Sequence, residues 1–233
     1  MSETWLTNSV QMSYVQLPGY KLETKNRTGR RGGGVGMYIL DDLNYKRRKD
    51  IENETDIENL WIQYKDMVIG VAYRPPSNNG NEWLEKLETT LQFIQSTWHG
   101  KIMLCGDMNF DLLKSSATNG SNIIQSYQNL LDTYNLTQHI TKPTRTDQQT
   151  QKESLLDHIV TNMTTLLLKE CVLPTSEISD HDCVFAIFNL KVKHYASYKF
   201  IRDEKQLKME NFVNDLKSVT GYLCLTLLQS IKR

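Results

Sequence analysis

The clearest hydrophobic pattern of the chain lies between Asn81 and Trp98. Apolar side chains recur there at every third or fourth position, at Leu84, Leu87, Leu91, Ile94 and Trp98. This spacing is typical of a helix that buries one face. The sequence therefore predicts a helix over Asn81–Trp98, and a similar pattern predicts a second helix over Ile123–Tyr134.

Short apolar runs rich in β-branched residues predict strands before, between and after these helices. The predicted strands cover Val35–Leu40, Leu60–Tyr64, Val68–Tyr73, Lys101–Gly106, Leu156–Val160 and Cys183–Leu190. The turn 65–67 would join the second and third of them as a hairpin, and Pro75 and Pro76 would stop the third, because proline cannot donate to a strand ladder. Strands that alternate with helices predict a mixed α/β domain.

Two charged segments are predicted to lie outside the packed core. Tyr20–Arg31 holds five basic residues and one acidic residue before Gly32, Gly33 and Gly34, which indicates a basic loop. The basic run Lys46–Lys49 and the acidic positions from Asp50 to Glu58 read as an excursion into solvent. Exposed charge is the usual reason for such runs.

Length and charge set the broad class of protein. The 233 residues are enough for one domain with a tail. Lys and Arg number 27 and Asp and Glu number 27, so a polyanion would have to be bound by a local patch and not by the net charge. The composition changes near Lys191, which predicts a domain over 1–190 and a basic, partly helical tail over 191–233, with a helix at Glu204–Val219.

The apolar stretches and the cysteines indicate the cellular compartment of the protein. No apolar run approaches the about 18 to 20 residues that cross a bilayer, and the amino terminus has no signal-like segment. We therefore expect an intracellular protein, nuclear or cytoplasmic, with no membrane contact and no obligate protein partner. The four cysteines have no zinc-site spacing and are predicted to be small buried side chains in a reducing compartment.

Three short polar segments follow or begin apolar runs and could carry chemistry. They are Gly106–Asp111, Ser154–Ile159 and Ser179–Asp182, and they hold carboxylates, an amide and imidazoles. Asp107 and Asn109 are two positions apart, so in an extended chain both side chains would point to one face. Taken alone, this pair is more typical of a turn or a helix cap, and a lone histidine is often a hydrogen-bonded surface or core residue.

The three segments together favour phosphoester hydrolysis. Oxygen donors with one imidazole suit Mg²⁺ better than zinc. A carboxylate can take a proton from water, and an imidazolium braced by a second carboxylate can neutralise charge on phosphorus. Serine hydrolase chemistry fits less well because the Gly-x-Ser-x-Gly motif is absent, and the glycine run before Val35 lacks the Gly-Lys-Ser/Thr ending of a phosphate-binding loop.

Seven segments in a fixed order resemble the endonuclease/exonuclease/phosphatase superfamily of DNase I-like fold. Within it, the sequence is similar to the endonuclease domain of LINE-type non-LTR retrotransposons from Ser2 to about Leu190. The segments are Ser2–Leu6, Gly32–Gly36, Tyr73–Ser77, Gly106–Asn109, Pro143–Arg145, Ser154–Ile159 and Ser179–His181. The resemblance implies a DNase I-like sandwich of two mixed sheets with flanking helices.

The resemblance also implies roles for particular residues. Glu3 would be the principal ligand of Mg²⁺, with Mn²⁺ as an alternative ion, and Asp180 would belong to the outer metal shell. Asp107 would be the base or a metal-linked carboxylate, and Asn109 would hold the attacking water or a phosphate oxygen. Asp157 would orient a protonated His181, and Tyr73 would hydrogen-bond the phosphate. Arg30, Arg31 and Arg145 would contact the DNA backbone.

The expected function is Mg²⁺-dependent nicking of DNA that leaves a 3′ hydroxyl. Members of the family carry a strand with an asparagine before the Glu-Thr-Trp-Leu segment, whereas this sequence opens at Met1, so the resemblance implies the fold with its first strand missing and a weakened activity. Two alternatives stay open. One is an apurinic-site endonuclease or a phosphatase of the same fold, and the other is a non-catalytic remnant of a retroelement.

Overall fold

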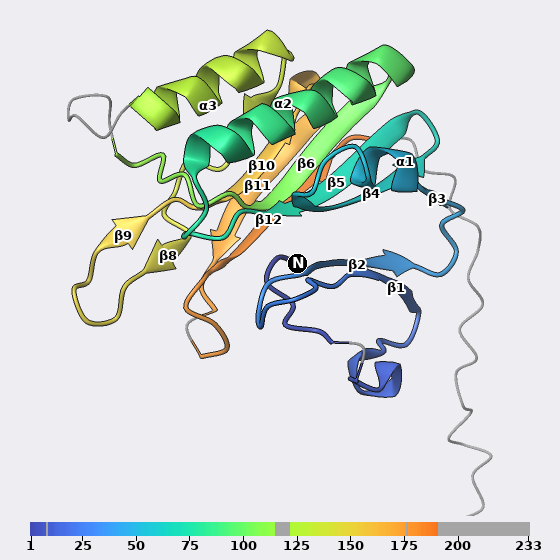
Figure 1. Cartoon of the computed structure of the whole chain (residues 1–233), viewed down its shortest axis with the longest axis horizontal. Coiled ribbons are helices and arrows are strands. Elements are labelled where there is room, and N and C mark those ends of the chain that lie inside the picture. Colours follow the sequence, from blue (N-terminus) through green and yellow to red (C-terminus); the bar gives the residue numbers. More distant parts are fainter. Residues whose placement is uncertain (8, 115–121, 176, 191–233) are drawn as a thin grey trace, which may run out of the picture. The chain divides into compact units, whose positions relative to one another are not determined.

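A six-stranded mixed sheet forms the centre of the fold (Figure 1). The computed structural model describes residues 1–7, 9–114, 122–175 and 177–190. The strands lie in the order β3 (Lys46–Arg47), β4 (Glu58–Tyr64), β5 (Met67–Tyr73), β6 (Lys101–Asp107), β10 (Asp157–Thr161) and β7 (Thr137–Gln138). Strands β5 and β6 run parallel and the other neighbours run antiparallel.

Helices cover one face of this sheet. Helices α2 (Gly80–Thr97) and α3 (Asn122–Thr133) lie side by side on it, and the short α1 (Lys49–Glu52) lies near α2 (Figure 1). The apolar stripe of α2, with Leu87, Leu91 and Ile94, packs into one cluster with Trp61 and Leu104 of the sheet. Asn79 begins α2 because its side chain accepts a hydrogen bond from the backbone N–H of residue 81 at 3.0 Å.

Two small antiparallel sheets lie against the other face. Strands β1 (Tyr20–Lys25) and β2 (Val35–Leu40) form one, and β11 (Leu167–Leu173) and β12 (Cys183–Phe188) form the other. Val35 of β2 packs on Val71 of the central sheet, and Val184 of β12 packs near Ile159. A hairpin of β8 (Arg145–Thr146) and β9 (Glu153–Ser154) projects beside them (Figure 1). The predicted mixed α/β class is confirmed, although two small antiparallel sheets stand in place of the second of the two predicted mixed sheets.

The prediction that the two charged segments lie outside the packed core is wrong in part. Tyr20–Lys25 is strand β1, and a loop begins only after it. In the second segment Glu52 is buried, because Arg47 binds it through two hydrogen bonds of 2.9 Å and the backbone N–H of Trp61 donates to it at 3.2 Å. Charge patterns cannot reveal such pairs, which make the burial of a carboxylate tolerable.

Other differences concern cysteines and chain ends. Cys183 is exposed and Cys105 and Cys171 are only partly buried, so the prediction of buried cysteines is wrong for these three. Strand β12 ends at Phe188, two residues before the predicted end. Cys224, the helix over 204–219 and the tail over 191–233 lie outside the described residues.

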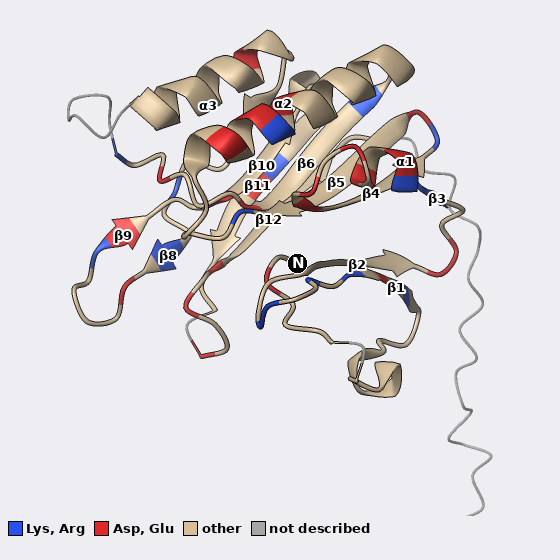
Figure 2. Cartoon of the chain, in the orientation of Figure 1, with Lys and Arg blue, Asp and Glu red and all other residues tan. Residues whose placement is uncertain are grey.

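Charge is mixed over the described surface. Figure 2 shows basic and acidic positions interspersed along helices, strands and loops. In the described part of the chain, no helix combines the length and the apolar character that crossing a bilayer requires.

Candidate functional site

Three strands of the central sheet bring Tyr73, Asp107 and Asp157 to one edge. Tyr73 of β5 pairs in register with Asp107 of β6, and Asp107 pairs with Asp157 of β10. Each of the three is less than a tenth exposed. Because β5 and β6 end where the antiparallel β10 begins, residues 84 positions apart in the chain meet without any help from loops.

Gly106 allows the two strands that carry this cluster to approach. Its φ of +136° is one that side-chain-bearing residues rarely adopt, and a Cβ there would lie 1.9 Å from the carbonyl oxygen of Ala72. The clash would be with backbone, so no side-chain rotation could relieve it. Glycine is therefore required immediately before Asp107.

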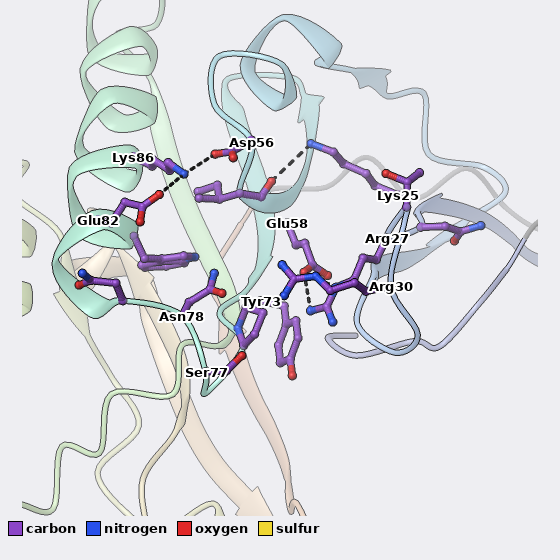
Figure 3. A pocket seen from close by; sticks show the side chains of 16 residues that line it. Lys25, Arg27, Arg30, Asp56, Glu58, Tyr73, Ser77, Asn78, Glu82 and Lys86 are labelled. Carbon is purple, nitrogen blue, oxygen red and sulfur yellow. Dashed lines mark hydrogen bonds and ion pairs between the residues drawn. The ribbon is translucent and has the colours of Figure 1, made fainter.

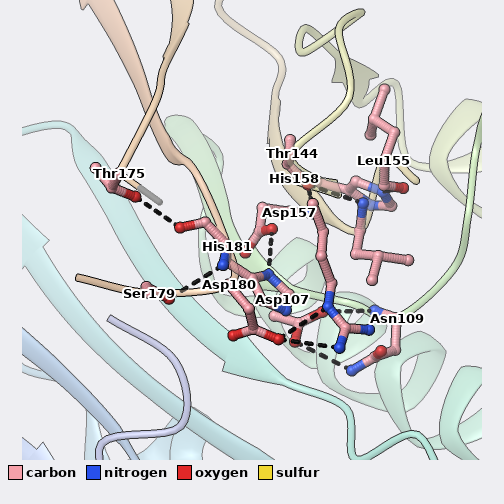
Figure 4. Close-up of polar contacts among 12 residues, drawn as sticks. Asp107, Asn109, Thr144, Leu155, Asp157, His158, Thr175, Ser179, Asp180 and His181 are labelled. Atoms are coloured by element: carbon pink, nitrogen blue, oxygen red, sulfur yellow. Dashed lines mark hydrogen bonds and ion pairs between the residues drawn. The ribbon is translucent and has the colours of Figure 1, made fainter. Parts of the chain in front are cut away.

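Asp107 and Asn109 form a small hydrogen-bonded turn (Figure 4). Asn109 has a φ of +50°, and its backbone N–H donates to Asp107 Oδ1 at 3.0 Å. Its side-chain Nδ2 donates to Asp107 Oδ2 at 3.1 Å and to the carbonyl oxygen of Arg74 at 2.7 Å. The two side chains thus meet, as predicted, but through a turn and not through an extended chain.

Asp157 and His181 form the second polar pair (Figure 4). His181 Nδ1 lies 2.8 Å from Asp157 Oδ2. Thr144 Oγ1 accepts the backbone N–H groups of residues 156 and 157, both at 3.1 Å, and so fixes the start of β10. On the other side, Thr175 Oγ1 donates to the carbonyl oxygen of His181 at 2.6 Å. Threonine hydroxyls therefore fix the backbone of both partners, Thr144 at Asp157 and Thr175 at His181.

The electrostatics of the site follow from burial and close carboxylates. Burial, and next the charge of Asp157, raise the pKa of Asp107 to about 7, although His181 acts in the opposite direction. Burial by itself lowers the pKa of His181, but the hydrogen bond and charge of Asp157, with Asp107 and Asp180, outweigh it and raise the pKa above its usual value. The site can therefore hold a protonated imidazole beside a proton-accepting carboxylate.

Glu3 reaches the same edge from the amino-terminal segment. Burial, and next the charge and hydrogen bond of Glu3, raise the pKa of the Tyr73 hydroxyl. The charge of Glu3 also contributes to the raised pKa of the Asp107 carboxyl group. The segment is held by the backbone bonds Thr4 N–H to Gly34 O at 3.1 Å and Trp5 N–H to Gly33 O at 2.9 Å. Glu3, predicted from the resemblance alone, thus lies with Tyr73 and Asp107.

The donor set fits a hydrated divalent cation better than an all-protein metal cage. No group of three or more His, Cys, Asp or Glu side chains among the described residues could hold a metal ion. Glu3 and Asp107 nevertheless place two carboxylates at one edge of the sheet. Mg²⁺ is commonly held by one or two carboxylates together with waters and substrate phosphate.

Arg145 and Asp180 pair with each other. Arg145 Nη2 lies 2.9 Å from Asp180 Oδ2, and its Nε donates to the same oxygen at 3.0 Å. Residue 145 also forms an isolated backbone bridge with His181. The arginine predicted to contact DNA and the aspartate predicted for the outer metal shell are therefore engaged together at the rim, whereas Arg30 and Arg31 are exposed.

Two cavities flank the polar cluster of Tyr73, Asp107, Asn109, Asp157 and His181. One of about 470 Å³ is lined by Tyr73, Arg27, Arg30 and polar side chains of the loop before α2 (Figure 3). The other, of about 640 Å³, is lined by Asn109, Arg145 and basic and apolar side chains of the α3 and β9 regions. The cluster lies between them, because Tyr73 borders one cavity and Asn109 the other.

Sequence reasoning did not single out three residues that shape the site. Arg27 lies 5.7 Å from the centre of the Tyr73 ring, and its Nε donates to Glu58 Oε1 at 2.7 Å. Glu58 also accepts the backbone N–H of Gly34 at 2.6 Å. Thr144 is the third. Arg27 and Thr144 lie within segments that the sequence marks as basic or motif-like, whereas nothing in the sequence marks Glu58.

A family model described as endonuclease-reverse transcriptase matches residues 67–185, slightly more than half of the chain. Among curated proteins, none matches.

Solved structures share the fold at low sequence identity. The endonuclease domain of TRAS1, a telomere-specific non-LTR retrotransposon, has a TM-score of 0.58 at 16% identity, over 76% of this chain and 83% of that chain. The 3′ phosphatase NExo from Neisseria, bound to a product DNA hairpin, has a TM-score of 0.60 at 18% identity, over 81% and 87%. An AP endonuclease from Archaeoglobus fulgidus has a TM-score of 0.57 at 14% identity, over 82% and 88%.

Proposed function

The chain belongs to the endonuclease-reverse transcriptase family, within the endonuclease/exonuclease/phosphatase superfamily, and on this premise we propose that it hydrolyses phosphodiester bonds of DNA. One observation carries the proposal. Tyr73, Asp107 and Asp157 are aligned on three adjacent strands, and His181 is bound to the last of them.

A divalent cation, Mg²⁺ or Mn²⁺, would be held by Glu3 and Asp107 together with water. Such a cation supplies positive charge that stabilises the phosphate oxygens and the departing oxygen. The carboxylate chemistry of these two residues suits either ion, because both prefer oxygen ligands.

The residues of the chain have separate tasks in this proposal. Asp107 accepts a proton from the attacking water, and Asn109 keeps the Asp107 carboxylate oriented through its Nδ2. Protonated His181, braced by Asp157, donates a hydrogen bond to a non-bridging phosphate oxygen. The Tyr73 hydroxyl would turn its proton from Glu3 to the phosphate as a second donor. The water oxygen forms a bond to phosphorus while the bond from phosphorus to the 3′ oxygen breaks, and the departing 3′ oxygen takes up a proton from solvent water. The product strand ends are a 3′ hydroxyl and a 5′ phosphate.

The two flanking cavities support DNA as the substrate class. Basic residues line both together with acidic ones, and Arg30 on one side of the cluster and Lys152 on the other form no ion pair among the described residues. A strand that crosses the cluster could place one phosphate over Tyr73 and His181 and neighbouring phosphates near these cations. Such a substrate would be held over several nucleotides.

Nicking of supercoiled plasmid in Mg²⁺ tests the proposal directly. We expect Asp107→Asn to lower the nicking rate about 10²- to 10⁴-fold, because it removes the proton acceptor. Asp132→Asn, which changes an exposed aspartate of α3, is the matched control and should leave the rate unchanged. A rate that is equal in the Asp107→Asn variant and the wild type would support the alternative of a non-catalytic remnant.

Two further measurements address the cation and the substrate. Mg²⁺ should raise the midpoint of thermal unfolding in the wild type and less so in Glu3→Gln, whereas Glu54→Gln, at an exposed glutamate, should respond as the wild type does. A panel of intact plasmid, abasic duplex, 3′-phosphorylated duplex and phosphoinositide separates DNA nicking from apurinic-site cleavage and phosphatase activity. Faster turnover of any of the last three would contradict the preferred substrate.

A further inference from the structure

Trp5 is an exposed tryptophan two residues after Glu3. Its side chain is 53% exposed, whereas Trp61 and Trp83 are buried and Trp98 is partly buried. Tryptophan is highly buried on average, so a half-exposed indole is unusual. Neither the packing of the core nor the proposed phosphate chemistry uses it.

The backbone holds the indole in this exposed position. Trp5 has a φ of +56°, in the left-handed region that non-glycine residues rarely occupy. Its N–H donates to the carbonyl oxygen of Gly33 at 2.9 Å, and the N–H of Thr4 donates to Gly34 at 3.1 Å. A conformation that is unfavourable by itself is thus stabilised by the glycine segment. The hydrogen-bonded turn therefore holds the indole in its exposed position.

Arg31 and Gly32 support the indole. The guanidinium carbon of Arg31 lies 5.4 Å from the ring centre, which is within the range of a cation–π contact. A Cβ on Gly32 would lie 3.5 Å from the indole carbons Cε2 and Cζ2, so the glycine backbone lies close to the ring. In the part of the chain that the structure describes, Arg31 forms no ion pair, so its charge is available to a ligand.

Charge and position indicate which ligand this surface would take. Between Thr24 and Leu40 the sequence has four basic residues and no acidic one. Glu3 lies two residues before Trp5, and its charge and hydrogen bond help to raise the pKa of the Tyr73 hydroxyl in the catalytic cluster. A ligand with a flat π face and a negative backbone fits an indole with an arginine beside it, and a nucleotide has both.

We propose that Trp5 and Arg31 form a stacking platform for one unpaired nucleobase close to the phosphate that the site binds. This inference rests on the proposed function and deepens it. In a paired duplex both faces of each base are covered by neighbouring bases, so only an unpaired nucleotide can offer a face to the indole. The protein should therefore prefer DNA with an unpaired nucleotide near the cleavage position.

Binding without cleavage tests the platform. Short fluorescein-labelled duplexes of one sequence are compared by anisotropy in EDTA: fully paired, with one unpaired thymine, and with an abasic analogue at that position. We expect the full wild-type chain to bind the unpaired thymine about tenfold more tightly than the abasic analogue, which corresponds to about 1.4 kcal/mol. Trp5→Ala should bind both equally, and Trp5→Phe should keep a smaller preference because it retains a ring.

Matched variants and a second signal keep the test decisive. Tyr14→Ala removes an 80% exposed aromatic elsewhere and should keep the full preference. The unpaired thymine should quench tryptophan emission of the wild type and not that of Trp5→Phe. Equal affinity of the wild type for thymine and abasic duplexes, or a preference that survives in Trp5→Ala, overturns the platform.

The outcomes also separate this inference from the proposed function. A base preference without any Mg²⁺-dependent nicking supports the platform and contradicts the hydrolytic function. Nicking that depends on Asp107 but shows no base preference in binding supports the function and overturns the platform.

Discussion

Two histidines on either side of strand β10 occupy opposite environments. His158 lies among packed side chains behind the strand, is not exposed, and its Nδ1 lies 3.0 Å from the Tyr127 hydroxyl. Burial lowers its pKa to about 4. His181 lies in front, is partly exposed and bound to Asp157, and its pKa is raised.

The comparison shows that the partner decides the role of a histidine. Asp157 and His158 are adjacent on one strand, so their side chains point to opposite faces. The face that holds the carboxylate becomes a polar site, and the pKa of its imidazole is raised. The face that holds His158 becomes core, where a neutral imidazole stacks on Tyr127 with ring centres 5.4 Å apart.

The largest expected effect comes from removing the histidine in front. His181→Ala should lower DNA nicking about 10²- to 10⁴-fold because the phosphate loses its positively charged donor. The free energy of unfolding should fall as well, because Asp157, which is less than a tenth exposed, would lose the partner of its carboxylate. Plasmid nicking and thermal unfolding measure the two effects. His99→Ala, at an exposed histidine, is the control, and equal losses in both variants would contradict the assignment.

The second effect is a loss of stability in acid that comes from His158, which is buried behind β10. The folded pKa of His158 lies below its unfolded value of about 6.5, so the native form binds fewer protons there. The contribution of His158 to the free energy of unfolding should therefore fall by about 3 kcal/mol as the pH falls from about 6.5 to about 4. Asp107, whose pKa is raised to about 7, acts in the opposite direction over the same range, because the native form takes up a proton there. The raised pKa of His181 acts oppositely, because it adds stability at low pH that is lost as the pH rises through the folded value.

Urea unfolding at a series of pH values measures this slope. His158→Gln cannot ionise and should be less stable at neutral pH but less sensitive to acid. His99→Gln should keep the wild-type slope, because His99 is exposed in the fold. An unchanged slope in His158→Gln would show that other groups cause the acid sensitivity.

The third effect is expected from Asp157, which precedes His158 in the chain and binds His181. Asp157→Asn removes the charge that raises the pKa of His181, and the remaining neighbours, Asp107 and Asp180, act more weakly. The alkaline fall in nicking, where His181 loses its proton, should move to lower pH. At neutral pH the rate should fall about tenfold. A pH–rate profile checks this, and an alkaline limb that is the same in Asp157→Asn and Asp132→Asn would exclude Asp157 from this role.

The helices, most strands and the sheet edge of the site could be predicted from the sequence because apolar periodicity and strand order determine them. Asp107 follows a buried run, and Asp157 begins one, so their convergence needs only strand pairing. Glu3 lies on a segment without periodicity and is predicted only through resemblance. His181 lies in the polar segment Ser179–Asp182 that the sequence singles out, but its pairing with Asp157 comes from resemblance. Glu58 and the short β1 could not be predicted, since they depend on ion pairs and contacts between distant segments.

The smallest expected effect is the loss of one hydroxyl behind the strand. Tyr127→Phe should lower the free energy of unfolding by about 1 to 3 kcal/mol, because His158 Nδ1 loses its partner in a buried place. The ring remains, and with it the stacking on Phe110 at 4.9 Å between centres. Urea unfolding measures the loss.

Nicking by the Tyr127→Phe variant should stay within about twofold of the wild type under folded conditions. The reason is that Thr144, and not Tyr127, holds the backbone N–H of Asp157. Tyr14→Phe, at an exposed tyrosine, should change neither stability nor nicking. If Tyr127→Phe instead lowered nicking as strongly as Asp157→Asn, the packed region behind β10 would help to position the catalytic pair, and the separation between the two histidines would fail.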